Sequence, residues 1–235
     1  MDLILSSGYL AFARHLGVVD AVAACGVEPE AVVGTSSGAL VGALLQARVE
    51  PQRMAAILSQ RPLWSLGLHR APWRGVFSTH RIADTLQQHL PERFEQLAGP
   101  LAVGVADARG CHRLLHCGPL LPALLASMAI PWLFPSVQCD GQRFVDGGVS
   151  DRVAVAAWRL WRPGRRAIVH VVERSRGRDV PFDARDCVVV RTPRTRASLW
   201  SLGDFKSHER EARATADEAL AGACSLLAKP ATAER

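Results

Sequence analysis

The sequence predicts an α/β fold in which a central, mostly parallel sheet carries helices on both faces. Short apolar runs of strand length alternate with segments of helical periodicity, the pattern of parallel strand–helix–strand units. Glycine follows several of the apolar runs, where the chain would turn from a strand into a helix. The length of 235 residues suits one domain, 1–235, with a core at about 1–192 and a C-terminal helix at about 202–227.

The first quarter of the chain already shows this alternation. We expect a strand at 2–6, a helix at 12–25, a strand at 31–33, and helices at 38–47 and 51–59. Gly26 follows the first helix, as glycine commonly does at helix ends. The chain start carries an acidic residue and no basic stretch, so we interpret it as a first strand and not a signal peptide.

The later elements follow the same pattern with one interruption. Residues 60–78 are broken by proline and glycine and predict an irregular segment. After them we expect a helix at 79–90, a strand pair at 101–108 and 111–117, a helix at 119–129, a strand at 144–148, a helix at 153–161, and strands at 165–173 and 187–192.

Composition limits the classes of function. Hydrophobic residues make up 49% and charged residues 21%, and no apolar run is long enough to span a membrane. The net charge is +6, and nearly all of the basic residues are arginine. Such a charge fits an anionic lipid surface or a compositional bias of the source genome. Six cysteines without a CxxC pair indicate reduced thiols. We therefore expect a cytoplasmic protein, either free or peripheral at a membrane surface, with no nucleic-acid partner.

The segment AVVGTSSGALVGALL, residues 31–45, places a serine between a strand and a helix. Ser36, and not Ser37, is centred between Gly34 and Gly38 in a Gly-x-Ser-x-Gly pattern. In that pattern a strained turn exposes the serine hydroxyl next to a helix N-terminus, which can stabilise a developing oxyanion. The alternative is an ordinary glycine-rich connection between a strand and a helix.

A serine nucleophile needs a base, and two candidates follow in the chain. Asp146 and then His170 would satisfy the order of an α/β-hydrolase triad. His170, however, lies within a predicted strand, where a buried structural histidine is the more common role. Asp146 precedes Gly147 and Gly148, which leave room for close approach, although Asp-Gly also occurs in plain turns.

Taken together, these motifs resemble those of the patatin-like phospholipase family over most of the chain. The matching segments are LILSSG at 3–8, HLGVV at 15–19, the serine segment, ASMAIPWLFPSV at 126–137, and FVDGGV at 144–149. The resemblance implies a three-layer patatin-like fold and a Ser–Asp dyad. In that dyad Ser36 attacks a lipid ester or phospholipid, and Asp146 accepts the hydroxyl proton.

The implied reaction passes through an acyl-enzyme and needs no cofactor or metal. Acyl transfer to an acceptor other than water would use the same residues. By the same resemblance, the backbone N–H groups of Gly8, Tyr9 and Leu10 would form the oxyanion hole.

The loop at residues 7–12, which we call the oxyanion loop, departs from the family pattern. Only one of three expected glycines remains, Ala11 stands in place of a basic residue and Phe12 in place of a glycine. Arg14 is a candidate replacement for the lost cation. These changes leave open a second hypothesis, a non-catalytic patatin-fold protein that binds lipid or a partner.

The irregular segment at 64–77 combines bulky apolar residues with arginine. Tryptophan and arginine suit the headgroup region of a membrane, so this segment is a candidate lid or lipid interface. It could equally pack into the core or form a dimer contact, and the sequence does not define an oligomeric state. The apolar candidates are Trp64, Leu66, Leu68, Trp73 and Phe77.

Overall fold

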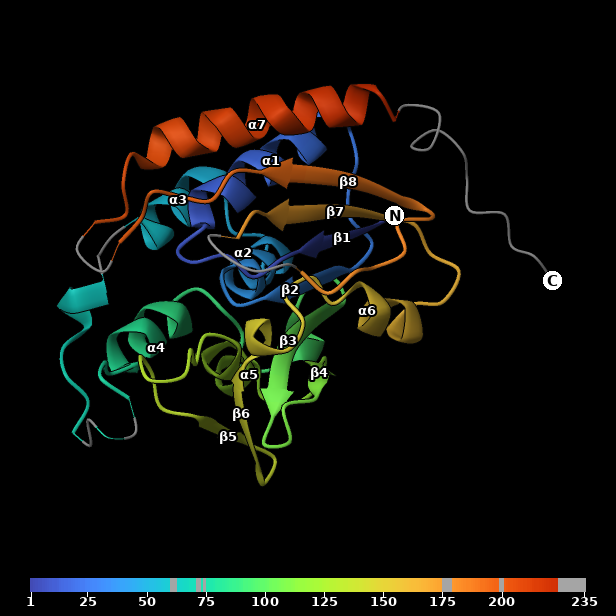
Figure 1. The fold of residues 1–235 in the computed structure, drawn as a ribbon. Coiled ribbons are helices and arrows are strands. Elements are labelled where there is room, and N and C mark those ends of the chain that lie inside the picture. The colour runs from blue at the N-terminus through green and yellow to red at the C-terminus, as the bar shows by residue number, and fades with distance from the viewer. Residues whose placement is uncertain (60–62, 71–72, 74, 175–178, 199–200, 224–235) are drawn as a thin grey trace.

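The computed structural model describes residues 1–59, 63–70, 73, 75–174, 179–198 and 201–223. Within them the strands form one sheet of eight, ordered β5–β6–β3–β2–β1–β7–β8, with β4 also paired to β3 (Figure 1). The strands are β1 (Asp2–Leu5), β2 (Val32–Thr35), β3 (Leu101–Asp107), β4 (His112–Leu115), β5 (Val137–Cys139), β6 (Gln142–Asp146), β7 (Ala167–Val172) and β8 (Cys187–Thr192).

The sheet is mostly parallel, which confirms the predicted fold class. Strands β3, β2, β1, β7 and β8 pair in parallel, whereas β4, β5 and β6 pair antiparallel. Strand β5 was not expected from the sequence. It is three residues long and follows two prolines, so it carries too little alternation to be recognised.

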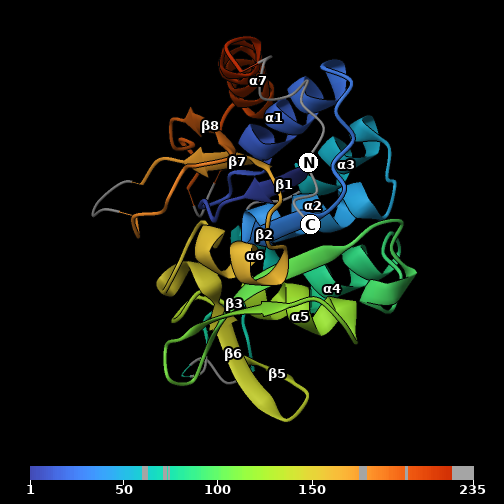
Figure 2. The ribbon, with the colours of Figure 1, turned by 90° about the vertical axis from the view of Figure 1, so that its right-hand side faces the viewer.

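Helices cover both faces of the sheet (Figures 1 and 2). Helices α1, α2, α3, α5 and α7 supply side chains to the core on one face, whereas α6 supplies the smaller core on the other. The helices are α1 (Phe12–Ala24), α2 (Ser37–Gln46), α3 (Pro51–Leu58), α4 (His80–Gln87), α5 (Leu120–Ser127), α6 (Val155–Trp161) and α7 (Phe205–Ala221). Within the described residues, none of these is both long and apolar enough to cross a membrane.

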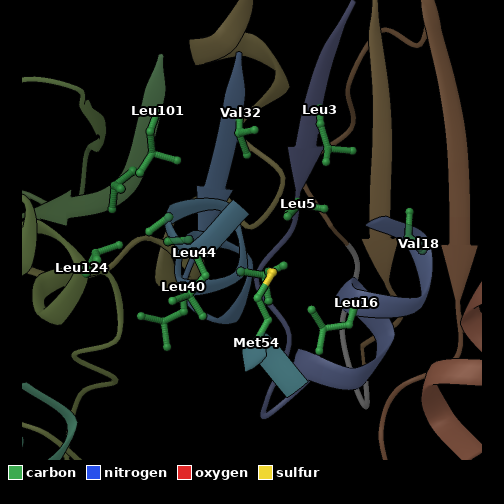
Figure 3. Packing of buried hydrophobic residues seen from close by; sticks show 14 of the residues in the cluster. Leu3, Leu5, Leu16, Val18, Val32, Leu40, Leu44, Met54, Leu101 and Leu124 are labelled. Atoms are coloured by element: carbon green, nitrogen blue, oxygen red, sulfur yellow. The ribbon is translucent and has the colours of Figure 1, made fainter. Parts of the chain in front are cut away.

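Alternation along the strands divides the core between the two faces. In β1, Leu3 and Leu5 join the larger cluster and Ile4 the smaller one. In β2, Val32 and Val33 divide in the same way, because successive side chains of a strand point to opposite faces. Figure 3 shows the larger cluster between the strands and helices α1, α2 and α3.

Helix α7 packs along α1. It begins at Phe205 and not near residue 202, and residues 224–227 of the expected helix lie outside the described residues. The contact is close at Gly17, where a Cβ would lie 2.1 Å from the Glu209 carbonyl oxygen. Buried Arg14 donates to the His208 carbonyl and pairs with Glu211 on α7. Arg14 therefore serves this helix contact and does not replace the missing cation of the oxyanion loop.

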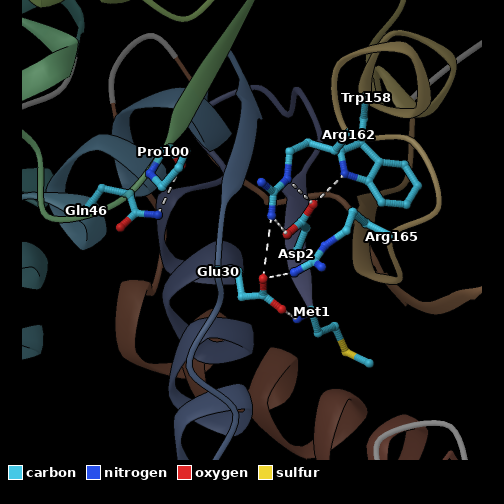
Figure 4. Close-up of polar contacts among 8 residues, drawn as sticks. All are labelled: Met1, Asp2, Glu30, Gln46, Pro100, Trp158, Arg162 and Arg165. Carbon is cyan, nitrogen blue, oxygen red and sulfur yellow. Dashed lines mark hydrogen bonds and ion pairs between the residues drawn. The ribbon is translucent and has the colours of Figure 1, made fainter. Parts of the chain in front are cut away.

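A polar cluster fixes α6 to the amino end of β1 (Figure 4). The buried Asp2 carboxylate accepts a hydrogen bond of 2.9 Å from the Trp158 indole and two of 3.1 Å from the Arg162 guanidinium. Glu30 lies beside it and pairs with the chain amino group and Arg165. Because each buried charge has a partner, this cluster ties two layers together without leaving an unpaired ion in the interior.

Candidate active site

The pairing of β3 brings together two residues that lie far apart in the sequence. Strands β2 and β6 both pair with the same edge of β3. Thr35, at the end of β2, lies opposite Gly104, and Asp146, at the end of β6, lies opposite the next residue, Val105. The opposite edge pairs with β4. Ser36 follows Thr35 directly, so the sheet register itself places Ser36 beside Asp146.

Ser36 occupies a strained turn between β2 and α2. Its φ of 54° and ψ of −118° are unusual for a residue with a side chain. Both flanking glycines are required by close contacts: a Cβ at Gly34 would lie 2.5 Å from the Gly38 carbonyl oxygen, and one at Gly38 would lie 2.3 Å from the Leu5 carbonyl oxygen. This geometry is that of a nucleophile elbow.

A buried serine that sequence reasoning missed supports the turn. Ser127, at the end of α5, accepts a hydrogen bond of 2.8 Å from the Ser36 N–H. Its own hydroxyl donates to the Gly104 carbonyl at 2.7 Å. Ser127 lies in the ASMAIP segment quoted above, but nothing in that segment alone indicates contact with the elbow.

Asp146 is a buried carboxylate with few partners, and only 3% of its surface is exposed. The Gly148 N–H donates to it at 2.7 Å, and the nearby Ser36 hydroxyl favours its charged form. Burial raises the pKa of Asp146 to about 6, against the opposing effects of Ser36, Gly148 and the charge of Arg152. A carboxylate with such a pKa is a much better base near neutral pH than a solvated one.

Close contacts also require glycine at the two positions after Asp146. A Cβ at Gly147 would lie 2.7 Å from the Gly104 carbonyl, and one at Gly148 would lie 2.6 Å from the Ser7 hydroxyl. The acid-bearing turn is therefore packed directly against β3 on one side and the start of the oxyanion loop on the other.

Residues 8–11 form a tight turn closed by a hydrogen bond from the Ala11 N–H to the Gly8 carbonyl. Leu10 adopts a positive φ of 49°, the backbone conformation that a glycine would take more easily. Within the described residues, the N–H groups of Gly8, Tyr9 and Leu10 donate no hydrogen bond. All three residues border the same cavity as Ser36.

The N–H of Ser37 is a further donor that the sequence analysis did not include. It is the first N–H of α2 and has no partner among the described residues. The residue after the nucleophile commonly contributes to an oxyanion hole.

His170 belongs to a separate, buried polar chain. The Ser37 hydroxyl donates to the Gly8 carbonyl at 2.7 Å and contacts His15 Nε2 at 3.2 Å. His15 Nδ1 and His170 Nδ1 are 2.8 Å apart, and His170 Nε2 is 2.8 Å from the Thr192 hydroxyl. Burial lowers the pKa of His15 to about 3 and that of His170 well below its usual value. Both ring nitrogens of His170 are thus engaged away from Ser36.

One assignment of hydrogens satisfies every contact in this chain. Ser37 donates to Gly8 and so accepts from His15 Nε2–H; His15 Nδ1 then accepts from His170 Nδ1–H. His170 Nε2 in turn accepts from the hydroxyl of Thr192. Neutral imidazoles supply one donor and one acceptor each, as this order requires.

A mostly apolar cavity of about 520 Å³ opens beside Ser36. Its volume lies within the range of small-molecule sites. Among the described lining residues, polar side chains come from the oxyanion loop, the serine turn and α4. The lining residues from beyond the loop and the elbow are Leu40, Ile57, Leu58, Leu66, Arg81, Ile82, Asp84, Thr85, Leu86, Met128, Ile130 and Phe134.

The candidate lid residues divide into two groups. Leu66 and Phe77 are buried in one cluster with Ala129 and Phe134 and are not part of an exposed surface; of the two, Leu66 lines the cavity. Leu68 and Trp73 are exposed, at 75% and 81% of their surface. The side chain of Trp64 lies outside the described part of the structure.

Trp132 was not anticipated as part of this surface. It is 87% exposed and has a positive φ of 72°. Its carbonyl accepts a hydrogen bond from the Val76 N–H, and the Leu133 carbonyl accepts one from the Phe77 N–H. Trp132 is thereby joined to the segment that carries Leu68 and Trp73.

Within the described part of the chain, no group of three or more His, Cys, Asp or Glu side chains could hold a metal ion. Cysteines 25, 111, 117, 139 and 187 are free thiols.

Comparison with known proteins agrees with the motifs. The patatin-like phospholipase family model matches residues 3–157, most of the chain. The chain therefore belongs to the patatin-like phospholipase family.

Among curated proteins, it is similar to an uncharacterized NTE family protein of Mycobacterium bovis and to counterparts in Mycobacterium tuberculosis. It is 30% identical to each of them over 158 residues. The match covers 66% of this chain but only 44% of those proteins, so this chain matches less than half their length.

Among solved structures, VipD from Legionella pneumophila superimposes with a TM-score of 0.58 over 94% of this chain and 66% of its own, at 12% identity. That similarity concerns the fold alone. The type III effector protein ExoU matches with a TM-score of 0.44 over 94% of this chain and 53% of its own, at 13% identity.

Proposed function

We propose that this chain is a lipid acyl hydrolase that cleaves carboxylic esters through a Ser36–Asp146 dyad. The observation that carries the proposal is the meeting of a strained, glycine-flanked serine with a buried aspartate whose pKa is raised to about 6. The apolar cavity beside them suits an acyl chain. Family membership supports a lipid substrate.

In the first step, Ser36 Oγ attacks the ester carbonyl while Asp146 accepts its proton. Negative charge then develops on the carbonyl oxygen. The N–H groups of Gly8, Tyr9, Leu10 and Ser37, which have no hydrogen-bond partner within the described residues, would stabilise it, and such donors are most effective in a site shielded from water. Collapse of the intermediate expels the alcohol, which takes the proton from Asp146 and leaves an acyl-serine.

In the second step, water replaces the alcohol. Asp146 removes a proton from the water as it attacks the acyl-serine, and then returns the proton to Ser36 as the acid is released. The reaction requires one base that can both accept and donate a proton near neutral pH, which is what a pKa of about 6 provides.

Labelling of the serine by a fluorophosphonate tests the proposal most directly. We expect the native chain to be labelled at Ser36 and to hydrolyse p-nitrophenyl esters and phospholipid vesicles. Ser36→Ala should abolish both labelling and hydrolysis. Ser37→Ala is the neighbouring comparison: it keeps the nucleophile and should still be labelled at Ser36, but more slowly, because the Ser37 hydroxyl holds the Gly8 carbonyl of the oxyanion loop.

Three outcomes would redirect the proposal. Absence of labelling and turnover in a folded chain would favour a non-catalytic lipid- or partner-binding protein. Loss of chemistry in His170→Ala with the fold intact would favour a Ser–Asp–His triad. Labelling with turnover only in the presence of an added alcohol would indicate acyl transfer.

We propose further that Leu68, Trp73 and Trp132 form the surface that contacts lipid. Their side chains are exposed on segments next to the buried cluster of Leu66 and Phe77, of which Leu66 lines the cavity. Arg70 and Arg81, also exposed, supply positive charge in the same region. Tryptophan together with arginine is suited to the headgroup boundary of a bilayer.

Vesicle sedimentation tests this surface. Trp73→Ser combined with Trp132→Ser should weaken binding to phosphatidylcholine vesicles containing phosphatidylglycerol, while hydrolysis of a short soluble ester stays at the native rate. Leu160→Ser is the matched control, because Leu160 is equally exposed but lies on α6. Equal binding by the double variant and the native chain would contradict the assignment.

A further inference from the structure

The oxyanion loop retains one of its expected glycines and lacks its own cation, yet its backbone is held from outside. Three successive carbonyl groups, those of Ser7, Gly8 and Tyr9, each accept a hydrogen bond from a side chain of another element. The three donors are Arg152, Ser37 and Thr195. We call this set the three-carbonyl clamp.

Arg152 is the charged member of the clamp. One of its nitrogens donates to the Ser7 carbonyl at 2.5 Å and to the Val172 carbonyl at 2.9 Å, and the other pairs with Asp179 at 2.8 Å. In return, the Ser7 N–H donates to the Arg152 carbonyl at 2.7 Å. Ser7 and Arg152 are thus joined in both directions, and the guanidinium is largely buried.

The other two donors act on the next two carbonyls. The Ser37 hydroxyl donates to the Gly8 carbonyl at 2.7 Å and is itself oriented by His15. The Thr195 hydroxyl donates to the Tyr9 carbonyl at 2.8 Å. The donors come from α2 and from the segment after β8, regions far from the loop in sequence.

Peptide geometry links these carbonyls to the catalytic donors. Each carbonyl shares a planar peptide with the N–H of the following residue, and no peptide bond in the described residues is cis. In a trans peptide the C=O and N–H point in opposite directions. Holding the carbonyls of Ser7, Gly8 and Tyr9 therefore fixes the direction of the N–H groups of Gly8, Tyr9 and Leu10, the three that have no partner among the described residues.

We infer that Arg152, with Ser37 and Thr195, positions the oxyanion hole and brings a positive charge to a loop that has none of its own. Because Leu10 holds a strained φ, the turn needs external contacts to persist. A hydrogen bond from a cation also polarises the Ser7–Gly8 peptide and strengthens the Gly8 N–H as a donor. Arg152 and Thr195 are positioning residues, since they act through the backbone of the loop.

This inference rests on the proposed ester hydrolysis, so its test includes a measurement that does not need turnover. Arg152→Met, Arg152→Lys and Thr195→Val would be compared with the native chain for kcat and KM on a p-nitrophenyl ester. NMR order parameters of the Gly8, Tyr9 and Leu10 amides would be measured on the same proteins. Oxyanion contacts exist only in the transition state, so we expect kcat to fall and KM to stay constant.

The expected effects differ between the variants. Arg152→Met should lower kcat about 100-fold, as loss of an oxyanion donor does. Arg152→Lys should recover part of that loss, because an ammonium keeps the charge but cannot match the fork of the guanidinium. Thr195→Val should lower kcat about 2- to 10-fold, the net worth of one neutral hydrogen bond. In Arg152→Met the amide order parameters of the loop should fall from about 0.85 towards 0.6.

Two control variants separate positioning from stability. Arg162→Met removes an arginine that bonds a buried carboxylate at the other end of the sheet, so it should cost stability and leave kcat unchanged. Thr215→Val removes a threonine hydroxyl that bonds the Glu211 carbonyl within α7 and should change neither stability nor kcat.

Each outcome decides between the alternatives. Native kcat and native loop order in folded Arg152→Met would overturn the clamp, as would a raised KM with unchanged kcat. If the native chain shows no turnover and no serine labelling, the proposed hydrolysis fails, and the loop order parameters alone then decide whether Arg152 and Thr195 hold the loop.

Discussion

Two buried aspartates at opposite ends of the sheet behave in opposite ways. Asp2, at the amino end of β1, is 1% exposed and accepts three hydrogen bonds from Trp158 and Arg162. Asp146, at the carboxyl end of β6, is also almost fully buried, but within the described residues its carboxylate accepts a hydrogen bond only from the Gly148 N–H. The positive charge of Arg152 also acts on Asp146, but its guanidinium bonds the carbonyls of Ser7 and Val172 and pairs with Asp179.

The difference teaches how one residue type serves structure or chemistry. The Asp2 carboxylate is fully engaged by hydrogen bonds from Trp158 and Arg162 and joins two layers of the fold. A carboxylate that is buried with few donors is poorly stabilised as an anion, so its affinity for a proton rises. The cost of burying Asp146 is the source of its basicity.

The largest effect is expected when Asp146 itself is changed. Asp146→Asn should lower ester hydrolysis by about 10⁴-fold, as loss of the acidic member of a catalytic set does. Its unfolding free energy at pH 8 should equal or exceed that of the native chain, because the substitution removes a poorly compensated buried charge. Urea unfolding and steady-state kinetics on the same preparation provide both values. A large loss of stability would show that Asp146 is mainly structural.

The matching substitution at Asp2 should lower stability and leave activity unchanged. Asp2→Asn should lower the unfolding free energy by about 3–5 kcal/mol, the usual cost of removing one partner of a buried ion pair. The kcat of the folded fraction should stay at the native value, measured by urea titration followed through both fluorescence and activity. A reduced kcat under conditions where Asp2→Asn is fully folded would contradict a purely structural role for Asp2.

A third test concerns the support of the elbow. Ser127→Ala leaves the Ser36 N–H and the Gly104 carbonyl without their partner, and each unpaired buried group costs about 1–3 kcal/mol. We expect a loss of stability of that order and a slower rate of Ser36 labelling. Ser150→Ala is a suitable control, because that hydroxyl bonds the Gly147 carbonyl at 3.2 Å in a more exposed turn.

The smallest effect is the response to pH. The Asp146 pKa, raised to about 6, means that the base is lost as pH falls through that value, so kcat/KM should drop tenfold for each unit below pH 6. The sign for stability is opposite. Between pH 4 and 6 the folded state binds the extra proton, so Asp146 favours folding at low pH and opposes it as pH rises. A profile with its acid limb near pH 4 would indicate an ordinary, solvated carboxylate.

Local patterns were sufficient to predict the main elements. The elbow was recognisable because Gly34 and Gly38 flank Ser36 within five residues; the close contact at Gly34 lies inside that turn, and the one at Gly38 is with Leu5 of the neighbouring strand β1. Helix and strand positions followed from periodicity, since the core draws alternate residues of β1 and β2 to different faces. The exceptions, such as β5 and the true start of α7, lie where the pattern is short or interrupted by proline and glycine.

The exposed surface was predicted only in part. Composition alone suggested one apolar group at residues 64–77, whereas the structure buries Leu66 and Phe77 and leaves Leu68 and Trp73 exposed. Whether a side chain in an irregular segment faces inward depends on the elements that happen to lie beneath it. Trp132 joins the same surface through backbone hydrogen bonds that no local pattern indicates.

The sequence by itself determined the fold class, the strained position of Ser36 and the acid-bearing turn at Asp146, because these depend on short-range backbone geometry. The tertiary structure alone decided that β2 and β6 share one edge of β3, which places the two residues together. It also decided that Arg152 and Thr195 reach the carbonyls of the oxyanion loop. Such contacts join segments far apart in the chain, and their geometry exists only once the sheet register and the layers around it have formed.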